Sequence, residues 1–415
     1  MRAARALLNF RRSCTLRELS GGFGDLGTLL PIITALAVGG QISLTSSLVF
    51  GGIWNVLSGL HFGLPICVQP MKAIAAIALA QNLSAGEVSA AGISVGAIVF
   101  VLGATGLITW VARVTPPCIV KGLQLGTGIT LCSKAGAAVK KLVWGGANWL
   151  WWDNYEWALL AFLGCFALYR QPRVPLALIL FLVGLAFALA HIGVAQRNGD
   201  RDAPDWPAFR PGDFPPPSAP TPSELLSGFL KAGLGQLPLT TLNSVVALVY
   251  LAADLFPDRK SLSTRQVAMS VGLMNLVGCF FGSTPYCHGS GGLAGQYRFG
   301  ARTGTSVCIL GLLKIIVGLL FGSSLTGLLG SFPQSLLGVM LLISGVELAC
   351  SARTFCRKNA SDAEQRDSFT TVVVTAGMLI AFANDGVGFL SGVACYMLSK
   401  LPPDHLPAAN GGIRD

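Results

Sequence analysis

Apolar stretches long enough to cross a membrane recur along the whole chain, separated by short polar connections. A helix needs about 17–25 mostly apolar residues to cross a bilayer. Several stretches, such as 174–190 and 306–320, are apolar on every face rather than along a single stripe. A helix that is hydrophobic all round lies in lipid or in a large core. The pattern therefore predicts an all-α polytopic membrane protein.

The chain divides into two groups of seven apolar stretches on either side of a polar, proline-rich segment at 195–223. That segment cannot lie in lipid, because its backbone polar groups would have no partners. We expect fourteen transmembrane segments at 17–38, 43–62, 65–82, 86–111, 117–132, 153–170, 174–194, 224–252, 262–281, 285–303, 304–325, 333–351, 366–384 and 386–400.

Five regions follow from this division. We expect a cytosolic flank at 1–16, a first seven-span repeat at 17–194, a non-cytosolic loop at 195–223, a second repeat at 224–400 and a cytosolic tail at 401–415.

Composition and charge support a membrane protein and give it an orientation. Of the 415 residues 52% are hydrophobic and only 12% are charged, and the mean hydropathy is +0.63. Soluble domains carry about 25% charged residues. With both termini on one side, that side holds 19 of the lysines and arginines against 6 on the other. Basic loops stay in the cytosol, so both termini are expected there. The net charge of +10 thus reflects topology and not a nucleic-acid partner.

Cysteine spacing and motif content exclude several other classes of protein. The 11 cysteines are scattered singly, without a C-x-x-C motif. Neither a disulfide framework nor a metal site is indicated. No nucleophile–base pair or phosphate-binding loop suggests an enzyme, and no cofactor is expected.

The two halves resemble each other weakly, and Asp25 of the first half faces Gln236 of the second. Seven is an odd number, so the second half must enter the membrane from the opposite side. Inverted repeats of this kind build secondary transporters, with the substrate at the midplane between broken helices. Three pairs of segments match in the same order: 22–36 with 233–248, 65–67 with 285–287, and 117–125 with 333–341.

Both third spans predict a short extended piece followed by a half-helix. In the first half Gln69 and Pro70 precede "MKAIAAIALA", and proline suits the first helical turn. In the second half Ser290 is a candidate N-cap before Gly291 and Gly292. Each half-helix would direct free N–H groups and a positive dipole end at one site, which favours an anion. The polar stretch is tolerable because it lines a cavity.

Charged residues within the spans leave two interpretations open. Lys72 costs about 3 kcal/mol at membrane depth. It either serves the anion, directly or through Asp25, or has a structural role in which it pairs with Asp25 or snorkels to the membrane surface. Asp25 in turn either positions Lys72 or carries a coupled proton, and His288 is either a proton carrier or a hydrogen-bonded neighbour of the site. Four other residues have structural interpretations: Arg298 and Arg302 as cytosolic flanks, Glu347 as a carboxylate near a span end, and Asp385 in the turn between the last two spans.

The segments "GGFGDLGTLLPI", "VQPMKAIAA" and "CHGSGGLAGQYRFGARTG" resemble the molybdate transporter family, distant relatives of the sulfate permeases. The resemblance extends from about Leu16 to Leu401. It implies the seven-plus-seven fold shared with uracil permeases, with spans 1–4 and 8–11 in a core domain and spans 5–7 and 12–14 in a gate domain. It also leads us to expect no C-terminal regulatory domain.

The family motifs imply most of the substrate-binding residues, and the polar residues Thr28, Gln236 and Asn243 on the aligned first and eighth spans complete the set. Uracil permease relatives use carboxylates in the eighth and tenth spans for proton coupling. Here the eighth span has Gln236 and the tenth has no acid, so the coupling ion stays open. The motif positions are Gln69, Pro70, Met71, Lys72, His288, Gly289, Ser290, Gly291, Gly292 and Gln296.

The expected function is secondary-active import of molybdate, a tetrahedral oxyanion, by alternating access. A sulfate or other oxyanion transporter and an anion channel are the alternatives, and tungstate or sulfate are further candidate ligands. The protein would be embedded in a lipid bilayer, in the plasma membrane rather than a vacuolar or other endomembrane. A homodimer is one candidate assembly.

Overall fold

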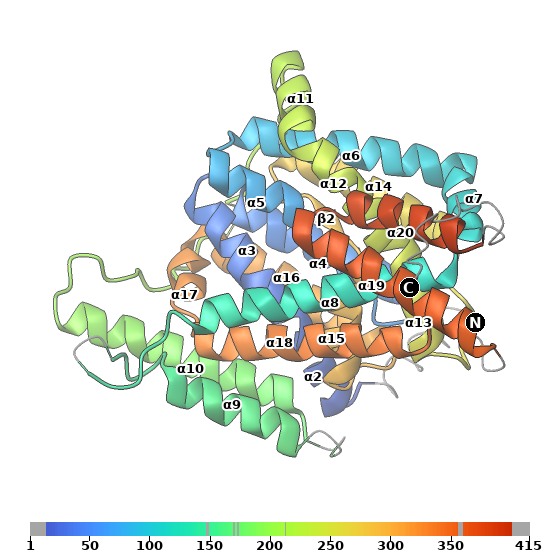
Figure 1. The fold of residues 1–415 in the computed structure, drawn as a ribbon. Coiled ribbons are helices and arrows are strands. Elements are labelled where there is room, and N and C mark those ends of the chain that lie inside the picture. Colours follow the sequence, from blue (N-terminus) through green and yellow to red (C-terminus); the bar gives the residue numbers. More distant parts are fainter. Residues whose placement is uncertain are drawn as a thin grey trace, which may run out of the picture.

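The computed structural model describes residues 14–146, 149–168, 171, 174–211, 213–355 and 360–400, and helices dominate them (Figure 1). The α-helices are α2 (Leu16–Gly22), α3 (Leu26–Val38), α4 (Leu44–Phe62), α5 (Lys72–Gln81), α6 (Ala85–Thr105), α7 (Leu107–Val114), α8 (Pro117–Val139), α9 (Tyr155–Ala167), α10 (Leu176–Arg197), α11 (Pro222–Gly228), α12 (Leu234–Pro238), α13 (Leu248–Leu255), α14 (Thr264–Gly278), α15 (Ser290–Arg298), α16 (Thr305–Phe321), α17 (Thr326–Gly330), α18 (Gln334–Cys350), α19 (Asp362–Phe382) and α20 (Asp385–Ser399).

Several of these helices form longer continuous stretches. A 3₁₀ turn at Phe23–Asp25 joins α2 to α3, and π-helical segments at Phe229–Gly233 and Leu239–Ala247 join α11, α12 and α13. Among the described residues, six stretches are long and apolar enough to cross a membrane: Leu16–Val38, Ala85–Thr105, Leu176–Arg197, Pro222–Leu255, Thr305–Gly330 and Gln334–Arg353.

Local sequence explains where helices begin and end, and it corrects two expected spans. Ser84 and Glu87 form a capping box at the start of α6. Gly106 adopts φ +79°, which glycine allows, and separates α6 from α7 within the expected span 86–111. No glycine or proline interrupts 129–135, and α8 continues to Val139, beyond the expected end at 132.

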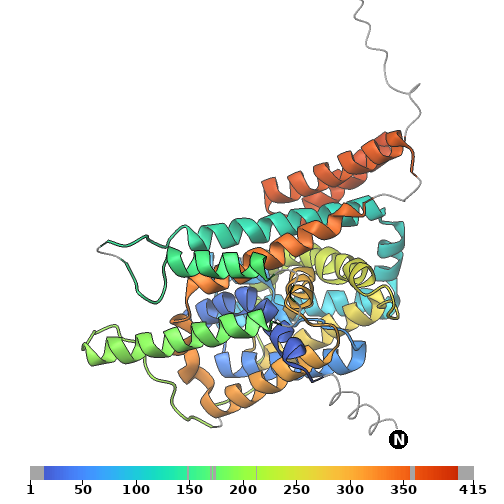
Figure 2. The same cartoon turned by 90° about the horizontal axis from the view of Figure 1, so that it is seen from below.

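Helices from distant parts of the chain pack in matching pairs. The α4 helix lies along α16, and α14 lies along α6. The long helices α8 and α18 also pack together, and α19 covers α8. In Figure 2, α19 and α20 lie along one side of the molecule, outside α8 and α18.

Two short strands meet in the interior. The strand β1 (Gln69–Pro70) pairs antiparallel with β2 (Tyr286–Cys287), with Gln69 opposite Cys287 and Pro70 opposite Tyr286. Each strand leads into a short helix, α5 or α15, so the expected extended pieces and half-helices are confirmed. Two details differ. Pro70 belongs to the strand rather than to the first helical turn, and the N-cap of α15 is Gly289, with Ser290 as the first helical residue.

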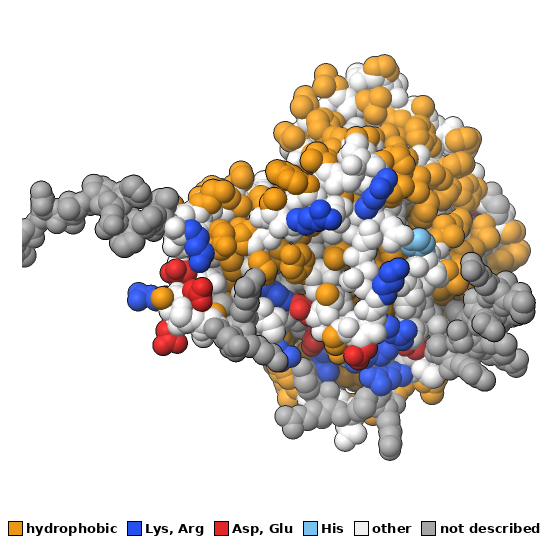
Figure 3. All heavy atoms as spheres, turned by 90° about the vertical axis from the view of Figure 1, so that its right-hand side faces the viewer, with side chains coloured by type: hydrophobic (Ala, Val, Ile, Leu, Met, Phe, Trp, Pro, Cys, Tyr) orange, Lys and Arg blue, Asp and Glu red, His pale blue; other side chains and the backbone are white. Residues whose placement is uncertain are grey.

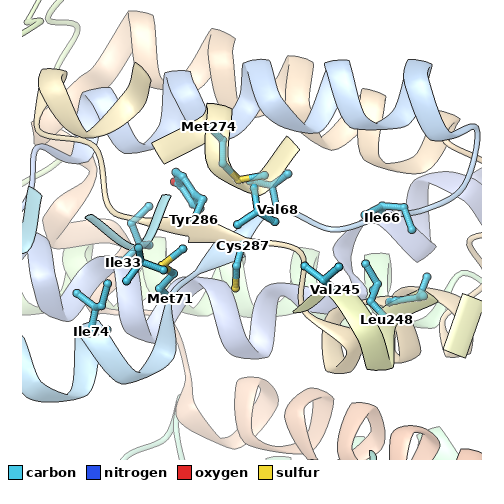
Figure 4. Packing of buried hydrophobic residues seen from close by; sticks show 14 of the residues in the cluster. Ile33, Ile66, Val68, Met71, Ile74, Val245, Leu248, Met274, Tyr286 and Cys287 are labelled. Atoms are coloured by element: carbon cyan, nitrogen blue, oxygen red, sulfur yellow. The ribbon is translucent and has the colours of Figure 1, made fainter. Parts of the chain in front are cut away.

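Apolar side chains enclose the two strands. Val68 and Tyr286 lie near Met274 of α14, and Ile33, Met71 and Ile74 gather on the other side of β1 (Figure 4). This packing fixes the point from which α5 and α15 start, because buried side chains leave little room for movement.

Basic side chains are spread over the face at the right of Figure 1, as Figure 3 shows. The described elements at that end include α7 with Arg113 in its last turn and the start of α14 with Arg265. These positions belong to the side that the charge count assigns to the cytosol.

Candidate functional site

A side chain from the second half of the sequence accepts hydrogen bonds from backbone N–H groups at the start of α5. Gln236 Oε1 accepts hydrogen bonds from the backbone N–H of Ala73 (2.9 Å) and of Ile74 (3.4 Å), and Gln236 Nε2 donates to Thr240 Oγ1 (2.8 Å). Gln236 is fully buried. The sequence predicted free N–H groups at this helix start. That expectation is wrong for Ala73 and Ile74, because the Gln236 amide satisfies them.

The start of α15 is open, in the sense that its first backbone N–H groups have no such acceptor among the described residues. No described residue outside α15 accepts a hydrogen bond from the backbone N–H groups of Ser290, Gly291 and Gly292. The first turn of a helix has no intrahelical acceptors for these donors. Ser290 Oγ donates to Asn243 Oδ1 (2.5 Å), which ties α15 to the π-helical segment Leu239–Ala247. The arrangement leaves three N–H donors at the positive end of a helix dipole.

Gln69 links this helix start to a buried carboxylate. With its amide nitrogen toward Asp25, Gln69 Nε2 donates to Asp25 Oδ1 (3.1 Å) and Gln69 Oε1 accepts from the Gly289 N–H (3.2 Å). A β-carbon on Gly292 would lie 2.8 Å from Asp25 Oδ1 and 2.3 Å from Cys67 Sγ. Asp25 therefore borders the start of α15, and glycine is required there for the close approach.

Two lysines are electrostatic neighbours of Asp25. Asp25 itself is buried, and Lys72, Lys314 and Thr28 all act on its charge. Lys314 Nζ donates to Asn55 Oδ1 (2.9 Å) and lies 5.5 Å from the Tyr286 ring centre. Lys72, the first residue of α5, has no hydrogen bond or ion pair within the described ranges. Its ammonium group is thus available to a ligand.

His288 is fully buried and uses both ring nitrogens within the protein. Nδ1 lies 2.8 Å from the Cys67 carbonyl oxygen, and Nε2 lies 2.9 Å from Ser270 Oγ. The ring also meets Phe62 edge-on, with the centroids 5.8 Å apart. These contacts favour the hydrogen-bonded neighbour over the proton carrier, because neither nitrogen is left for a ligand.

Two other expected site residues have different surroundings from the rest of the set. Met71 is the N-cap residue of α5, and its side chain is buried among the apolar side chains around β1. Gln296 is fully buried with neither amide atom hydrogen-bonded within the described ranges, and it lies six residues beyond Ser290. At about 1.5 Å per residue that is about 9 Å along the helix. The remaining expected residues, Thr28, Gln69, Pro70, Lys72, Gln236, Asn243, Gly289, Ser290, Gly291 and Gly292, gather around the two strands and helix starts.

Sequence reasoning missed three charged residues near this site. Lys314 was counted only as a residue within a span, although it neighbours Asp25. Lys134 was assigned to a loop, but it lies within α8 and neighbours both Lys72 and Asp385. The only signal for Lys134 was the absence of glycine and proline from 129–135.

Asp385 is the third of these residues. It lies in the expected turn, at the first position of α20, and its Oδ2 is buried with no hydrogen bond from any described residue. It neighbours both Lys72 and Lys134 electrostatically. The next residue, Gly386, packs on Pro238, two positions from the Gln236 that caps α5. Nothing in the sequence indicated that this turn reaches the site.

Comparison of the sequence with known proteins identifies relatives over most of its length. A family model described as "Molybdate transporter of MFS superfamily" matches residues 17–131 and 228–348. The chain is 36% identical over 438 residues to Molybdate transporter 1 of Arabidopsis thaliana, covering 95% of this chain and 92% of that protein. It is 36% identical over 431 residues to Molybdate transporter 2 of the same plant, covering 92% and 87%.

Among solved structures, the fold resembles those of SLC26A9 and of the murine Slc26a9 anion transporter in the inward-facing state. The TM-scores are 0.58 and 0.60, at 14% and 16% sequence identity. The matches cover 92% and 93% of this chain but only 65% and 68% of those longer chains.

Proposed function

Because the chain belongs to the molybdate transporter family and is an integral multi-pass membrane protein, we propose that it transports molybdate across its membrane by alternating access. The family consists of transporters rather than enzymes. The observation that carries the proposal is the open start of α15. Three unoccupied N–H donors lie in a buried region that also holds Lys72 and Lys314. A helix N-terminus with free donors is a binding site for an oxyanion.

The proposed ligand contacts are the N–H groups of Ser290, Gly291 and Gly292 together with the Lys72 ammonium. A dianion gains charge-assisted hydrogen bonds from such donors. Gln236 positions α5, and therefore Lys72, instead of contacting the ligand. Lys134 supplies a further positive charge, and Asp385 is its counter-charge when the ligand is absent.

Packing supports the proposed inverted repeat of fourteen spans. If each span corresponds to the one seven places later, the contact of α4 with α16 is equivalent to the contact of α14 with α6. The antiparallel pairing of β1 with β2 fits the same two-fold relation. We place spans 1–4 and 8–11 in a core domain, the others in a gate domain, and both termini in the cytosol.

Molybdate and sulfate are both tetrahedral dianions, so charge alone cannot distinguish them. Molybdate has longer bonds to oxygen, and sulfate would leave N–H donors at poor distances. Each badly formed hydrogen bond costs about 1 kcal/mol, so two or three give about a 10–100-fold preference. We therefore expect tungstate, which is close to molybdate in size, to compete well and sulfate to compete poorly.

The test is uptake of molybdate by vesicles containing the purified chain, followed by mass detection of molybdenum. Saturable uptake that tungstate suppresses far more strongly than equimolar sulfate supports the proposal. Equal suppression by sulfate would replace molybdate with a broader oxyanion specificity. Unitary currents in a planar bilayer, without saturation, would identify a channel instead.

A further inference from the structure

A small cavity lined by three arginines lies at the far end of α15 from the candidate site. It has a volume of about 90 Å³ and is bounded by Arg17 of α2, Arg298 at the end of α15, and Arg302. A single water needs about 10–15 Å³ of such space. The cavity shares no lining residue with the candidate site. Arg298 lies eight positions after Ser290 in α15, which is about 12 Å along the helix.

Backbone geometry brings Arg17 to this cavity. Arg17 lies in the first turn of α2, and its buried Nε has no hydrogen-bond partner within the described ranges. Gly300 adopts φ +118°, and a β-carbon there would lie 2.7 Å from Arg17 Cγ. Only glycine allows both this conformation and this approach. A buried donor without an acceptor is unfavourable unless a ligand supplies one.

The other two guanidinium groups are held in fixed orientations. Arg302 Nη1 donates to the carbonyl oxygens of Tyr297 (2.5 Å) and Ala301 (2.7 Å), and the guanidinium stacks 3.8 Å from the Tyr297 ring centre. Arg298 Nη2 donates to the Cys165 carbonyl oxygen (3.5 Å). Pre-positioned guanidinium groups bind oxyanions with little loss of side-chain entropy.

Nearby carboxylates do not cancel the three positive charges. The Glu18 carboxylate accepts hydrogen bonds from the backbone N–H groups of Arg302 (2.9 Å) and Thr303 (3.3 Å). Glu347 neighbours Arg298 and Arg302 electrostatically. Three arginines against two carboxylates leave an excess of one positive charge around a polar cavity.

We propose that this arginine cavity binds a phosphate group, carried by an anionic phospholipid or present as free phosphate. Arginine matches phosphate geometry with paired N–H donors. The cavity also joins α2 and α15 to α9 and α18, through Cys165 and Ile343. A bound phosphate group would hold these helices together at the end of α15 opposite the open helix start. Binding of phosphate in this cavity would therefore change the rate of transport. That effect rests on the proposed function, whereas the binding of phosphate does not rest on it.

The test measures thermal unfolding of the full chain, without molybdate, in neutral detergent. One arm adds inorganic phosphate against chloride at equal ionic strength, and the other adds micelles containing the anionic lipid phosphatidylinositol 4-phosphate against the zwitterionic lipid phosphatidylcholine. We expect a rise in Tm of a few degrees in at least one arm, because a ligand that binds only the folded state stabilises it. A rise in the first arm identifies free phosphate as a sufficient ligand, and a rise only in the second identifies the lipid.

The variants assign the effect to the cavity. Arg17→Gln should abolish the rise in Tm. Arg113→Gln, which removes an exposed arginine on α7 remote from the cavity, should retain it. If Arg17→Gln does not fold, Gln171→Glu, which places a carboxylate on the exposed part of the lining, should abolish the rise instead. No rise in either arm, or an equal rise with the cavity variants, would overturn the proposal. Because molybdate is absent, this result is independent of whether the chain transports it.

Discussion

At the scale of single residues, the two half-helices differ in what occupies their first turns. Gln236 fills the acceptor position at α5, whereas its counterpart in the repeat, Asp25, is bonded to Gln69 and borders α15 without capping it. The sequence predicted where both helices start, because proline, serine and glycine interrupt apolar runs. It could not predict the cap, since the bond from Ala73 to Gln236 joins residues 163 positions apart.

Lys72→Ala should reduce molybdate uptake by about tenfold or more while the protein remains folded. A hydrogen bond to a charged group is worth about 1.5–3 kcal/mol, and about 1.4 kcal/mol is tenfold. The measurement is initial uptake normalised to protein amount in the membrane. Lys141→Ala, at an exposed lysine just beyond α8, is the matched control. Wild-type uptake by the Lys72 variant would show that this lysine does not bind the substrate.

Adjacent glycines of α15 should respond differently to alanine. At Gly292 the new β-carbon meets Asp25 Oδ1 and Cys67 Sγ, so Gly292→Ala should lower both Tm and uptake. At Gly291 it meets chiefly the end of Leu131, 2.6 Å away, and a flexible side chain can move. Gly291→Ala should therefore keep most of the protein folded but raise the KM for molybdate.

Gly164→Ala is the control for both glycine variants, because no atom lies within 4 Å of its new β-carbon. The interpretation fails if Gly291→Ala and Gly164→Ala have the same KM, or if Gly292→Ala is as stable as the wild type.

At the scale of elements, the sequence predicted the strands and half-helices but not their surroundings. The extended pieces could be predicted because Pro70 and Pro285 interrupt the two third spans at matching positions, each before the start of a helix. Two other features depend on packing between segments far apart in sequence. Lys314 lies near Asp25, and the turn between α19 and α20 lies beside α12. Such contacts leave no periodic signal in a single chain. The end of α8 was missed for another reason, since small residues near 132 resemble a loop but also favour a helix.

Two substitutions at Gln236 separate the loss of the α5 cap from the effect of adding a negative charge at the same position. Gln236→Ala leaves the backbone N–H groups of Ala73 and the buried Ile74 without an acceptor. Losing such a cap costs about 1–2 kcal/mol, so Tm should fall. Gln236→Glu retains an acceptor at the positive end of the helix, so Tm should stay near the wild-type value. The added negative charge beside Lys72 should nevertheless repel the dianion and strongly reduce uptake.

Measurement of Tm and uptake for both Gln236 variants decides between a structural and an electrostatic role. Full uptake by Gln236→Glu would indicate that the substrate does not approach the start of α5.

At the scale of the whole molecule, a charged contact joins the two proposed domains. Lys121 of α8, which is 3% exposed, forms an ion pair with Asp254 of α13 and also donates to the Ser351 carbonyl oxygen (3.0 Å). Asp254 is 38% exposed. The pair lies at the end of α8 that the charge count assigns to the cytosol. In the proposed alternating access, contacts of this kind open and close. Nothing in the sequence indicated that these two residues meet.

Asp254→Asn should open this end of the molecule more often. A partly exposed pair contributes up to about 1 kcal/mol, which corresponds to about a fivefold change in an opening equilibrium. The reporter is Cys118, which is 4% exposed and lies in the first turn of α8. Its alkylation by a water-soluble thiol reagent, followed by peptide mass spectrometry, should be faster in the variant. Cys279, which is 1% exposed after α14, should react equally slowly in both proteins. Equal rates at Cys118, together with unchanged molybdate uptake, would show that the pair holds two helices together without taking part in transport.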